Sequence, residues 1–195
     1  MSDKLPLKMR PLVFIDIETT GLDPAEHEMI EFAGVMTTPQ GTPIDDVEFK
    51  IMPLHPENAS PEALKINGYN PKDWQDAVGP GYGIQKILSF CENGVIVGQN
   101  PSFDLGFINA LIKQQGLKNK MPYHKVDTAT LAYTTLVPLG LKSVSLGGIC
   151  DFLGISNKGA HGAMRDVERC MEAYFKMTRA TWFDKWQWKR RNCKS

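Results

Sequence analysis

The sequence lacks the features that mark secreted, zinc-binding or membrane proteins. Its four cysteines lie far apart and form no C-x-x-C pair, which argues against a cysteine zinc site and against a disulfide framework. No apolar run approaches the ~20 residues that a membrane span needs. Asp16 ends the first apolar run too early for a signal peptide. We therefore expect a protein of the reducing cytoplasm with no membrane partner. The cysteines are Cys91, Cys150, Cys170 and Cys193.

The whole chain also lacks an excess of charge of either sign, with 22 basic and 22 acidic residues among 195. Its composition, 42% hydrophobic and 23% charged, is that of a globular domain. The charge is unevenly distributed, because seven basic residues and one acid follow from Lys176 onward. This asymmetry predicts an acidic domain over residues 1–180 and a basic, aromatic C-terminal tail over residues 181–195 that belongs to the same domain or packs on it.

The hydrophobic pattern predicts a mixed α/β fold. Three strand-like segments with short, turn-rich connections come first, at 12–18, 29–36 and 47–51, and favour an antiparallel meander. Helix-like and strand-like segments then alternate, which implies a mixed sheet with helices on its faces. Ser60 and Asn100 are expected helix caps. The expected helices are 61–66, 84–92, 101–116, 145–154 and 162–180, and the later strands are 95–99 and 125–128.

Two acids stand on the most strand-like segment, FIDIETTGLD. The period of two places Asp16 and Glu18 on the same face as Phe14. Like charges so close repel each other, and a core strand is a costly place for them. Their position therefore calls for a neutralising partner.

Two further acids point in buried directions on predicted helices. Asp104 shares the apolar stripe of the 101–116 helix with Leu111. A helix-start acid that favours the helix dipole explains its place near the N-terminus but not its direction. Asp166 shares its direction with Cys170. A surface ion pair with the flanking Arg165 or Arg169 is the usual interpretation of such an acid, but it does not fit this direction.

The four carboxylates, Asp16, Glu18, Asp104 and Asp166, would each cost several kcal/mol if buried without a partner. No matching buried lysine or arginine is evident in the apolar stripes. Carboxylate-rich sites suit Mg²⁺, Mn²⁺ or Ca²⁺. Four acids could hold two such ions, an arrangement that recurs in phosphoryl-transfer enzymes. His161 stands five residues before Asp166, and a lone histidine near a helix start is more often a capping or packing residue than a catalyst.

Three segments, FIDIETTGLD, GQNPSFDLGFI and HGAMRDVE, resemble in order the three motifs of the DnaQ-like 3′–5′ exonucleases, and more narrowly the DEDDh branch. The resemblance covers about residues 12–177. It implies an RNase H-like fold, with a five-stranded mixed sheet whose first three strands are antiparallel, flanked by helices. It also implies that Asp16, Glu18, Asp104 and Asp166 bind two divalent metal ions, Mg²⁺ or Mn²⁺, and that His161 is the general base.

The same resemblance implies contacts with the terminal nucleotide. Backbone amides near Thr19 and Gly21 would approach it, Leu22 would wedge against the last base, and Phe103 would pack beside it. Each also has a plain structural interpretation, as a loop after a strand or as core. Asn67 stands where the family often has a histidine. The expected substrate-binding residues are Thr19, Gly21, Leu22, Asn67, Asn100 and Phe103.

The aromatic residues of the tail have two interpretations. Their rings could stack on bases, or Trp182 and Trp186, four residues apart, could pack an extended last helix onto the body. We favour packing.

Three functions remain open. The leading hypothesis is a metal-dependent 3′–5′ exonuclease that releases nucleoside monophosphates from the 3′ end of single-stranded DNA. The second is a 3′–5′ exoribonuclease that trims short RNA or tRNA ends. The third is a non-catalytic module, such as a subunit docked on a DNA polymerase. The sequence does not indicate the oligomeric state.

Overall fold

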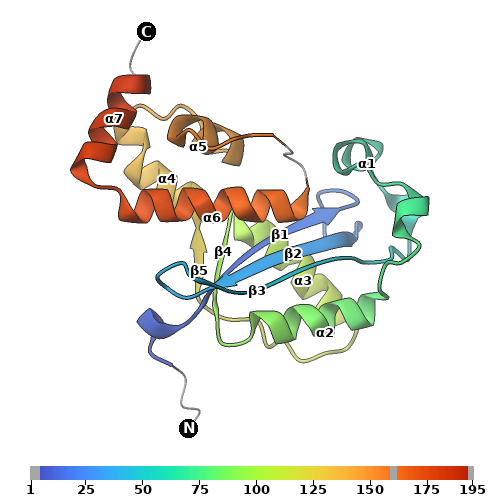
Figure 1. Ribbon diagram of the computed structural model, residues 1–195. Helices are drawn as coiled ribbons and strands as arrows, with labels where there is room; N and C mark the ends of the chain where they lie inside the picture. The colour runs from blue at the N-terminus through green and yellow to red at the C-terminus, as the bar shows by residue number, and fades with distance from the viewer. Residues whose placement is uncertain (1–4, 159–161, 193–195) are drawn as a thin grey trace.

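The protein folds around a five-stranded mixed sheet with the strand order β3-β2-β1-β4-β5 (Figure 1). A computed structural model describes residues 5–158 and 162–192. β1 pairs antiparallel with β2 and β2 with β3, whereas β1–β4 and β4–β5 are parallel. The predicted mixed sheet with an antiparallel meander is therefore confirmed. The strands are β1 Leu12–Thr19, β2 Met29–Thr37, β3 Pro43–Lys50, β4 Val95–Gly98 and β5 Lys125–Asp127.

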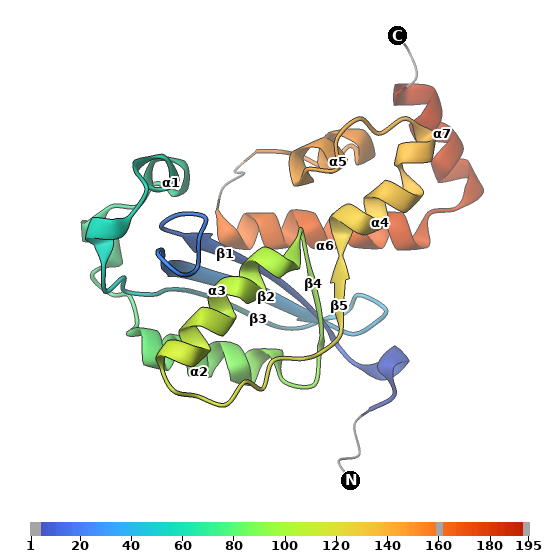
Figure 2. The same ribbon diagram turned by 180° about the vertical axis from the view of Figure 1, so that it is seen from behind.

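Helices cover both faces of the sheet, as Figures 1 and 2 show from opposite sides. The α-helices are α1 Pro61–Asn67, α2 Pro80–Cys91, α3 Pro101–Gln114, α4 Thr128–Thr135, α5 Leu146–Leu153, α6 Ala163–Arg179 and α7 Trp182–Asn192. Short 3₁₀ turns lie at Leu7–Met9, Pro56–Asn58, Pro71–Trp74 and Val137–Leu139. Within the described ranges, no helix is both long and apolar enough to cross a membrane.

The alternation along β1 divides the core into two layers. Val13, Ile15 and Ile17 pack against α2 and α3 on one face. Phe14 packs on the other face against α6, where it contacts a cluster that includes Val167. A third cluster lies where α4, α5 and α6 meet. The period-two prediction is confirmed, and it places Asp16 and Glu18 on the α6 side of β1.

Local capping explains where several helices begin. The Ser60 hydroxyl accepts a hydrogen bond from the Ala63 amide, with Pro61 in the first turn of α1. Asp127 accepts from the amides of Ala129 and Thr130 and begins α4 directly after β5. Because this cap comes after a strand without an intervening loop, the sequence pattern places Thr128 in the strand and does not reveal α4.

Three other expectations are corrected. Asn100 stands at the start of α3 with a φ of 56°, and among the described residues its side chain makes no capping bond. The third strand begins at Pro43 rather than 47, because β3 is an exposed edge strand without apolar alternation. The last helix is interrupted after Arg179, where the Thr181 amide and hydroxyl both donate to the Asp184 carboxylate and start α7.

Candidate active site

The four acids predicted from the sequence come from elements that meet at one end of β1. Asp16 and Glu18 lie in the last half of β1. Asp104 lies in the first turn of α3 and Asp166 in the first turn of α6. Figures 1 and 2 show α6 beginning beside the end of β1. The end of β1 and the beginnings of two helices therefore form one candidate site.

The pKa of Asp16 reflects the charge of the neighbouring acids. It is raised well above the usual value, first by burial and then by repulsion from Asp104, Asp166 and Glu18. Asp16 therefore lies within the electrostatic field of the other three acids, and it is the centre of the group.

Two of the other acids share this environment. The pKa of Glu18 is raised to about 7, first by burial and then by neighbouring carboxylates. Burial raises the pKa of Asp104 to about 7, although hydrogen bonds from its own amide and from the Ile17 amide act in the opposite direction. Asp104 is 3% exposed, which confirms the helical-wheel prediction that it points inward. A site that raises the pKa of several acids together favours a bound cation.

Glu31 is a further acid at this site that the sequence pattern does not single out. It stands directly opposite Glu18 in the β1–β2 register. After burial, repulsion from the Glu31 carboxylate is the largest cause of the raised pKa of Glu18. Its own opposite residue on β3 is Lys50. The Lys50 ammonium, however, donates to the Asp73 carbonyl at 3.1 Å and lies 4.2 Å from the centre of the Trp74 ring. The register of the first hairpin, which no motif specifies, was the signal that could have found Glu31.

Asp166 differs from the other acids because it has a cationic partner. Arg169 Nη1 donates to Asp166 Oδ1 at 2.5 Å, and its Nη2 donates to the Asn157 side-chain oxygen. Arg169 is 3% exposed, and its Nε has no hydrogen-bond partner among the described atoms. The expectation that no buried arginine accompanies the acids was therefore wrong. At i+3 from Asp166, Arg169 borders the apolar stripe and is covered by the segment around Asn157.

His161, the expected general base, lies outside the described residues. The chain on both sides of 159–161 is held to α6. Arg165 Nε donates to the Lys158 carbonyl at 3.2 Å, and the Asp166 amide donates to the Gly162 carbonyl at 3.0 Å.

Two of the expected substrate residues make hydrogen bonds inside the protein. The Thr19 hydroxyl donates to the Gly21 carbonyl at 2.6 Å. The Asn67 amide group donates to the Thr19 carbonyl at 2.9 Å, and its oxygen accepts from the Tyr69 amide. Asn67 therefore ties α1 to the end of β1 and shapes the loop. A Cβ atom at Gly21 would lie 2.0 Å from the His27 ring, so a larger residue at this position would need that ring to move.

The remaining expected contacts differ in exposure. Leu22 is 81% exposed at the tip of the loop after β1, so its side chain is available to a ligand. Phe103 is half-buried, and its ring centre lies 5.1 Å from that of Phe107. Asn100 is exposed, and its amide donates to Asp127 Oδ1 at 2.9 Å. Phe103 thus contributes to the core as well as to the surface near the acids.

The donor set suits hard divalent cations, because every candidate ligand is a carboxylate oxygen. In the part of the chain that the structure describes, no three such side chains already converge at metal-binding geometry. The raised pKa values of Asp16, Glu18 and Asp104 nevertheless fit a site whose charge a cation balances.

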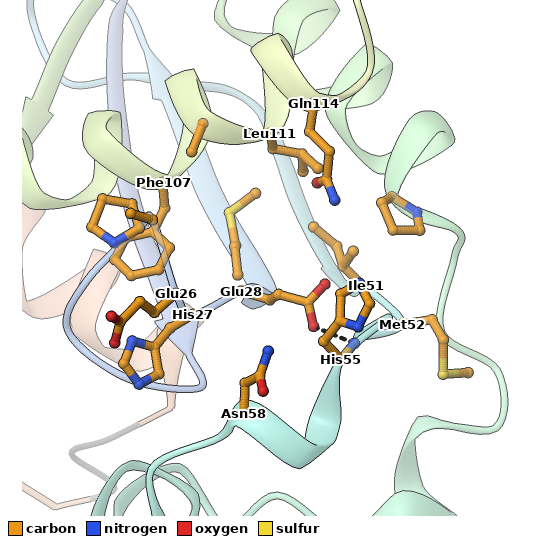
Figure 3. Close-up of a pocket in the computed structure, with 15 residues that line it drawn as sticks. Glu26, His27, Glu28, Ile51, Met52, His55, Asn58, Phe107, Leu111 and Gln114 are labelled. Carbon is orange, nitrogen blue, oxygen red and sulfur yellow. Dashed lines mark hydrogen bonds between the residues drawn. The ribbon is translucent and has the colours of Figure 1, made fainter.

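A separate cavity of about 630 Å³ lies between the loop after β1, residues 51–58 and α3. Figure 3 shows His27, His55 and Glu28 at this cavity, with Phe107 and Leu111 of α3 above them. Both oxygens of Glu28 accept backbone hydrogen bonds, from the amides of Leu54 and His55. None of the four predicted acids lines this cavity, so it adjoins the candidate site without being part of it.

Comparison with known proteins places these features in one family. The family model RNase_T, described as an exonuclease, matches residues 13–174. The ribonuclease T of Shewanella frigidimarina is 33% identical over 181 residues, which covers 83% of this chain and 79% of that protein. The ribonuclease T of Shewanella denitrificans is also 33% identical over 181 residues, covering 83% of this chain and 77% of that protein.

Solved structures share the fold. Escherichia coli exonuclease I in complex with a dT13 oligonucleotide has a TM-score of 0.75 and 22% identity, covering 90% of this chain and 43% of that chain. A structure of apo exonuclease I has a TM-score of 0.75 and 20% identity, covering 92% of this chain and 44% of that chain. The present chain therefore spans less than half the length of exonuclease I, and the likeness confirms the RNase H-like fold.

Proposed function

This chain belongs to the RNase_T family of exonucleases, and on this premise we propose that it shortens single-stranded nucleic acid from the 3′ end by two-metal-ion hydrolysis. It is a 3′–5′ exonuclease, and its family depends on divalent metal ions. The observation that most supports the proposal is the placement of the four acids, with Asp16 and Glu18 on β1 and Asp104 and Asp166 in the first turns of α3 and α6. The pKa of Asp16 agrees with this placement, because burial and then the other three acids raise it. These acids are far apart in the sequence. Bound cations would offset the repulsion between their carboxylates when the fold brings them together.

The carboxylates of Asp16, Glu18, Asp104 and Asp166 would hold the two ions. When bound, the ions lower the pKa of a water molecule and stabilise the oxygen that leaves. The chain's contribution is to place the last phosphodiester group within this group of acids. The water oxygen then forms a bond to phosphorus while the bond to the 3′ oxygen of the preceding nucleotide breaks, which releases a nucleoside monophosphate.

His161 would accept the proton from the attacking water. The unperturbed pKa of histidine, about 6.5, lets it accept a proton near neutral pH, and a general base contributes roughly 10²–10⁴-fold in rate. It stands five residues before Asp166 in the sequence. Arg169 would orient Asp166 through the 2.5 Å bond that joins them.

The terminal nucleotide would lie against the loop after β1. Leu22 offers an exposed apolar side chain to the last base, and the half-buried Phe103 supports it from α3. Asn67 would act indirectly, because its side chain holds the Thr19 carbonyl at 2.9 Å. Loss of Asn67 should therefore loosen this loop.

A stepwise ladder from a 5′-labelled oligonucleotide tests the proposal. In Mg²⁺ we expect products that shorten one nucleotide at a time from the 3′ end, and a chelator should abolish them. An oligonucleotide blocked at its 3′ end is the matched control and should stay intact. Failure to shorten the free end in either Mg²⁺ or Mn²⁺ would refute the proposal.

The substrate of the proposed exonuclease is either single-stranded DNA or RNA. Single-stranded DNA is the expectation from the sequence. The relatives with 30–33% identity are named ribonuclease T, which favours RNA 3′ ends at least as well. Competition between differently labelled RNA and DNA of one sequence, in the same tube, decides between them. A DNA polymerase as partner stays a prediction that co-purification would test.

A further inference from the structure

The outer face of α7 exposes aromatic side chains that the fold does not need for packing. Trp182 is 79% exposed, Phe183 55% and Trp186 44%. The rings of Phe183 and Trp186 are nearly parallel, at 21°, with centres 5.9 Å apart. The expectation that Trp182 and Trp186 pack the helix onto the body was therefore wrong, and these rings are open to a ligand.

The opposite face of α7 anchors the helix. Trp188 packs against the hydrophobic cluster that includes Phe152 and Leu153. Arg191 donates to the Phe152 carbonyl, and Asn192 donates to the same oxygen at 3.3 Å. Because these contacts fix α7, the aromatic face is held in place as a preformed surface.

Basic side chains accompany the exposed rings. Lys189 and Arg190 lie within about 100° of the direction of Trp186 on the helix, and the Arg190 guanidinium lies 5.4 Å from the centre of the Trp186 ring. Aromatic rings interleaved with cations are typical of surfaces that bind single-stranded nucleic acid, because bases stack on the rings and phosphates pair with the charges.

We propose that the outer face of α7, formed by Trp182, Phe183, Trp186, Lys189 and Arg190, binds a single-stranded stretch of nucleic acid upstream of the 3′ end. The inference rests on the proposed function for the identity of the strand. The binding it describes, however, needs no metal and no cleavage.

A second copy of the chain fits this face less well. Two copies that met through the same face would bring two sets of basic side chains together, and like charges across an interface are unfavourable. Lysine is also depleted at protein interfaces. A polyanion satisfies the charge of Lys189 and Arg190, and the neighbouring rings accept any base.

The position of α7 sets the length of strand required. Figure 1 shows α7 at the end of α6 that is remote from the arrowhead of β1, where the acids of the candidate site lie. From Asp166 to Arg179, α6 extends for about 20 Å at 1.5 Å per residue. This distance corresponds to roughly six nucleotides at 3.4 Å per phosphate, the rise of a stacked strand, and a more extended strand spans it with fewer. A trimer bound at the acids is therefore too short to reach α7, whereas a twelve-mer is long enough.

Binding of a fluorescent single-stranded twelve-mer in EDTA, measured by anisotropy, tests the inference directly. The double variant Trp182→Ala/Trp186→Ala should bind at least tenfold more weakly than the unaltered protein. Tyr82→Ala, which removes a 61% exposed ring from α2, is the matched control and should bind as the unaltered protein does. The variant Lys189→Gln/Arg190→Gln should reduce the slope of log K against log salt by about 1.4.

Catalytic measurements in Mg²⁺ supply the second readout. The ratio of kcat/KM for a twelve-mer to that for a trimer should fall at least tenfold in the double tryptophan variant. Equal twelve-mer binding by this variant and the unaltered protein, with circular dichroism showing both folded, would overturn the inference. So would an oligomeric protein that becomes monomeric only when the tryptophans are removed, with its oligonucleotide binding intact. If nothing is cleaved but binding still depends on α7, the proposed function fails and this inference stands.

Discussion

Asp16 is mostly buried and is repelled by the other three acids of the candidate site. Burial and neighbouring carboxylates raise its pKa, so two bound cations would relieve it most. His161 has a different part in the proposed reaction, because it would exchange a proton and hold no metal. The two residues can therefore be separated experimentally.

We expect Asp16→Asn to abolish Mn²⁺ binding and exonuclease activity together, because it removes the central carboxylate with little change of shape. His161→Ala should keep Mn²⁺ binding and lose activity by roughly 10²–10⁴-fold. Calorimetric titration with Mn²⁺ and a nuclease assay on the same preparations check both. Equal loss of Mn²⁺ binding in the two variants would refute the assignment of roles.

The metal-free protein should become less stable as the pH rises. The pKa values of Glu18 and Asp104 are about 7 in the folded state, above their usual values near 4. The folded state therefore binds more protons than the unfolded chain between about pH 4 and 7, and stability is lost through this window.

In EDTA, we expect the free energy of unfolding to fall by about 5 kcal/mol between pH 5 and 8, with Glu18 and Asp104 contributing about equally. Urea denaturation at several pH values measures it. Added Mg²⁺ should restore stability at pH 8, because the cation binds the ionised acids of the folded state, and Glu18→Gln should flatten the profile. Stability in EDTA that is constant or rises over this range would contradict the electrostatic account.

At the scale of single residues, periodicity predicted the direction of side chains within a regular strand or helix. The alternation of β1 predicted the shared face of Asp16 and Glu18, and the helical wheel predicted the burial of Asp104. Periodicity could not predict the roles of Glu31 and Arg169. Their roles depend on which residue lies opposite on another strand, and on which loop covers a helix.

Among the elements, α6 carries the contacts that connect the site to the segment before it. Arg169 joins Asp166 to Asn157 while being buried. Arg165 is also in α6, but its pair with Glu168 is exposed to solvent. The two arginines therefore provide a matched comparison on one helix.

Arg169→Met should reduce the free energy of unfolding by about 2–4 kcal/mol, because it breaks a buried ion pair and leaves Asn157 without its donor. It should also lower activity, since Asp166 loses the group that orients it. Arg165→Met should change stability by less than about 1 kcal/mol. Denaturation curves of the three proteins check this, and equal stability of the two variants would show that Arg169 contributes no more than a surface pair.

Element boundaries were predictable where a cap or an apolar pattern marks them. Ser60 with Pro61 marked the start of α1, and the apolar run at 95–99 marked β4. The exposed strand β3 has no apolar alternation that would mark its start. Asn100 is of a residue type common at helix caps, but its backbone is left-handed and its side chain makes no capping hydrogen bond among the described residues. These cases depend on tertiary position, which local sequence does not encode.

For the whole molecule, the sheet order places the acids of β1 at the centre of the fold. β1 lies between β2 and β4, and α3 and α6 begin at the end where Asp16 and Glu18 stand. The meander and the alternating units were predictable from the sequence. The attachment of α7 to α5 was not, because it depends on Trp188 rather than on the tryptophans four residues apart.

The central claim is that acids from β1, α3 and α6 gather to hold divalent cations. Anomalous diffraction from crystals grown with Mn²⁺ tests it most directly. We expect two peaks roughly 3.5–4 Å apart among the carboxylates of Asp16, Glu18, Asp104 and Asp166. Peaks elsewhere, or Asp104 and Asp166 turned to solvent away from β1, would contradict it.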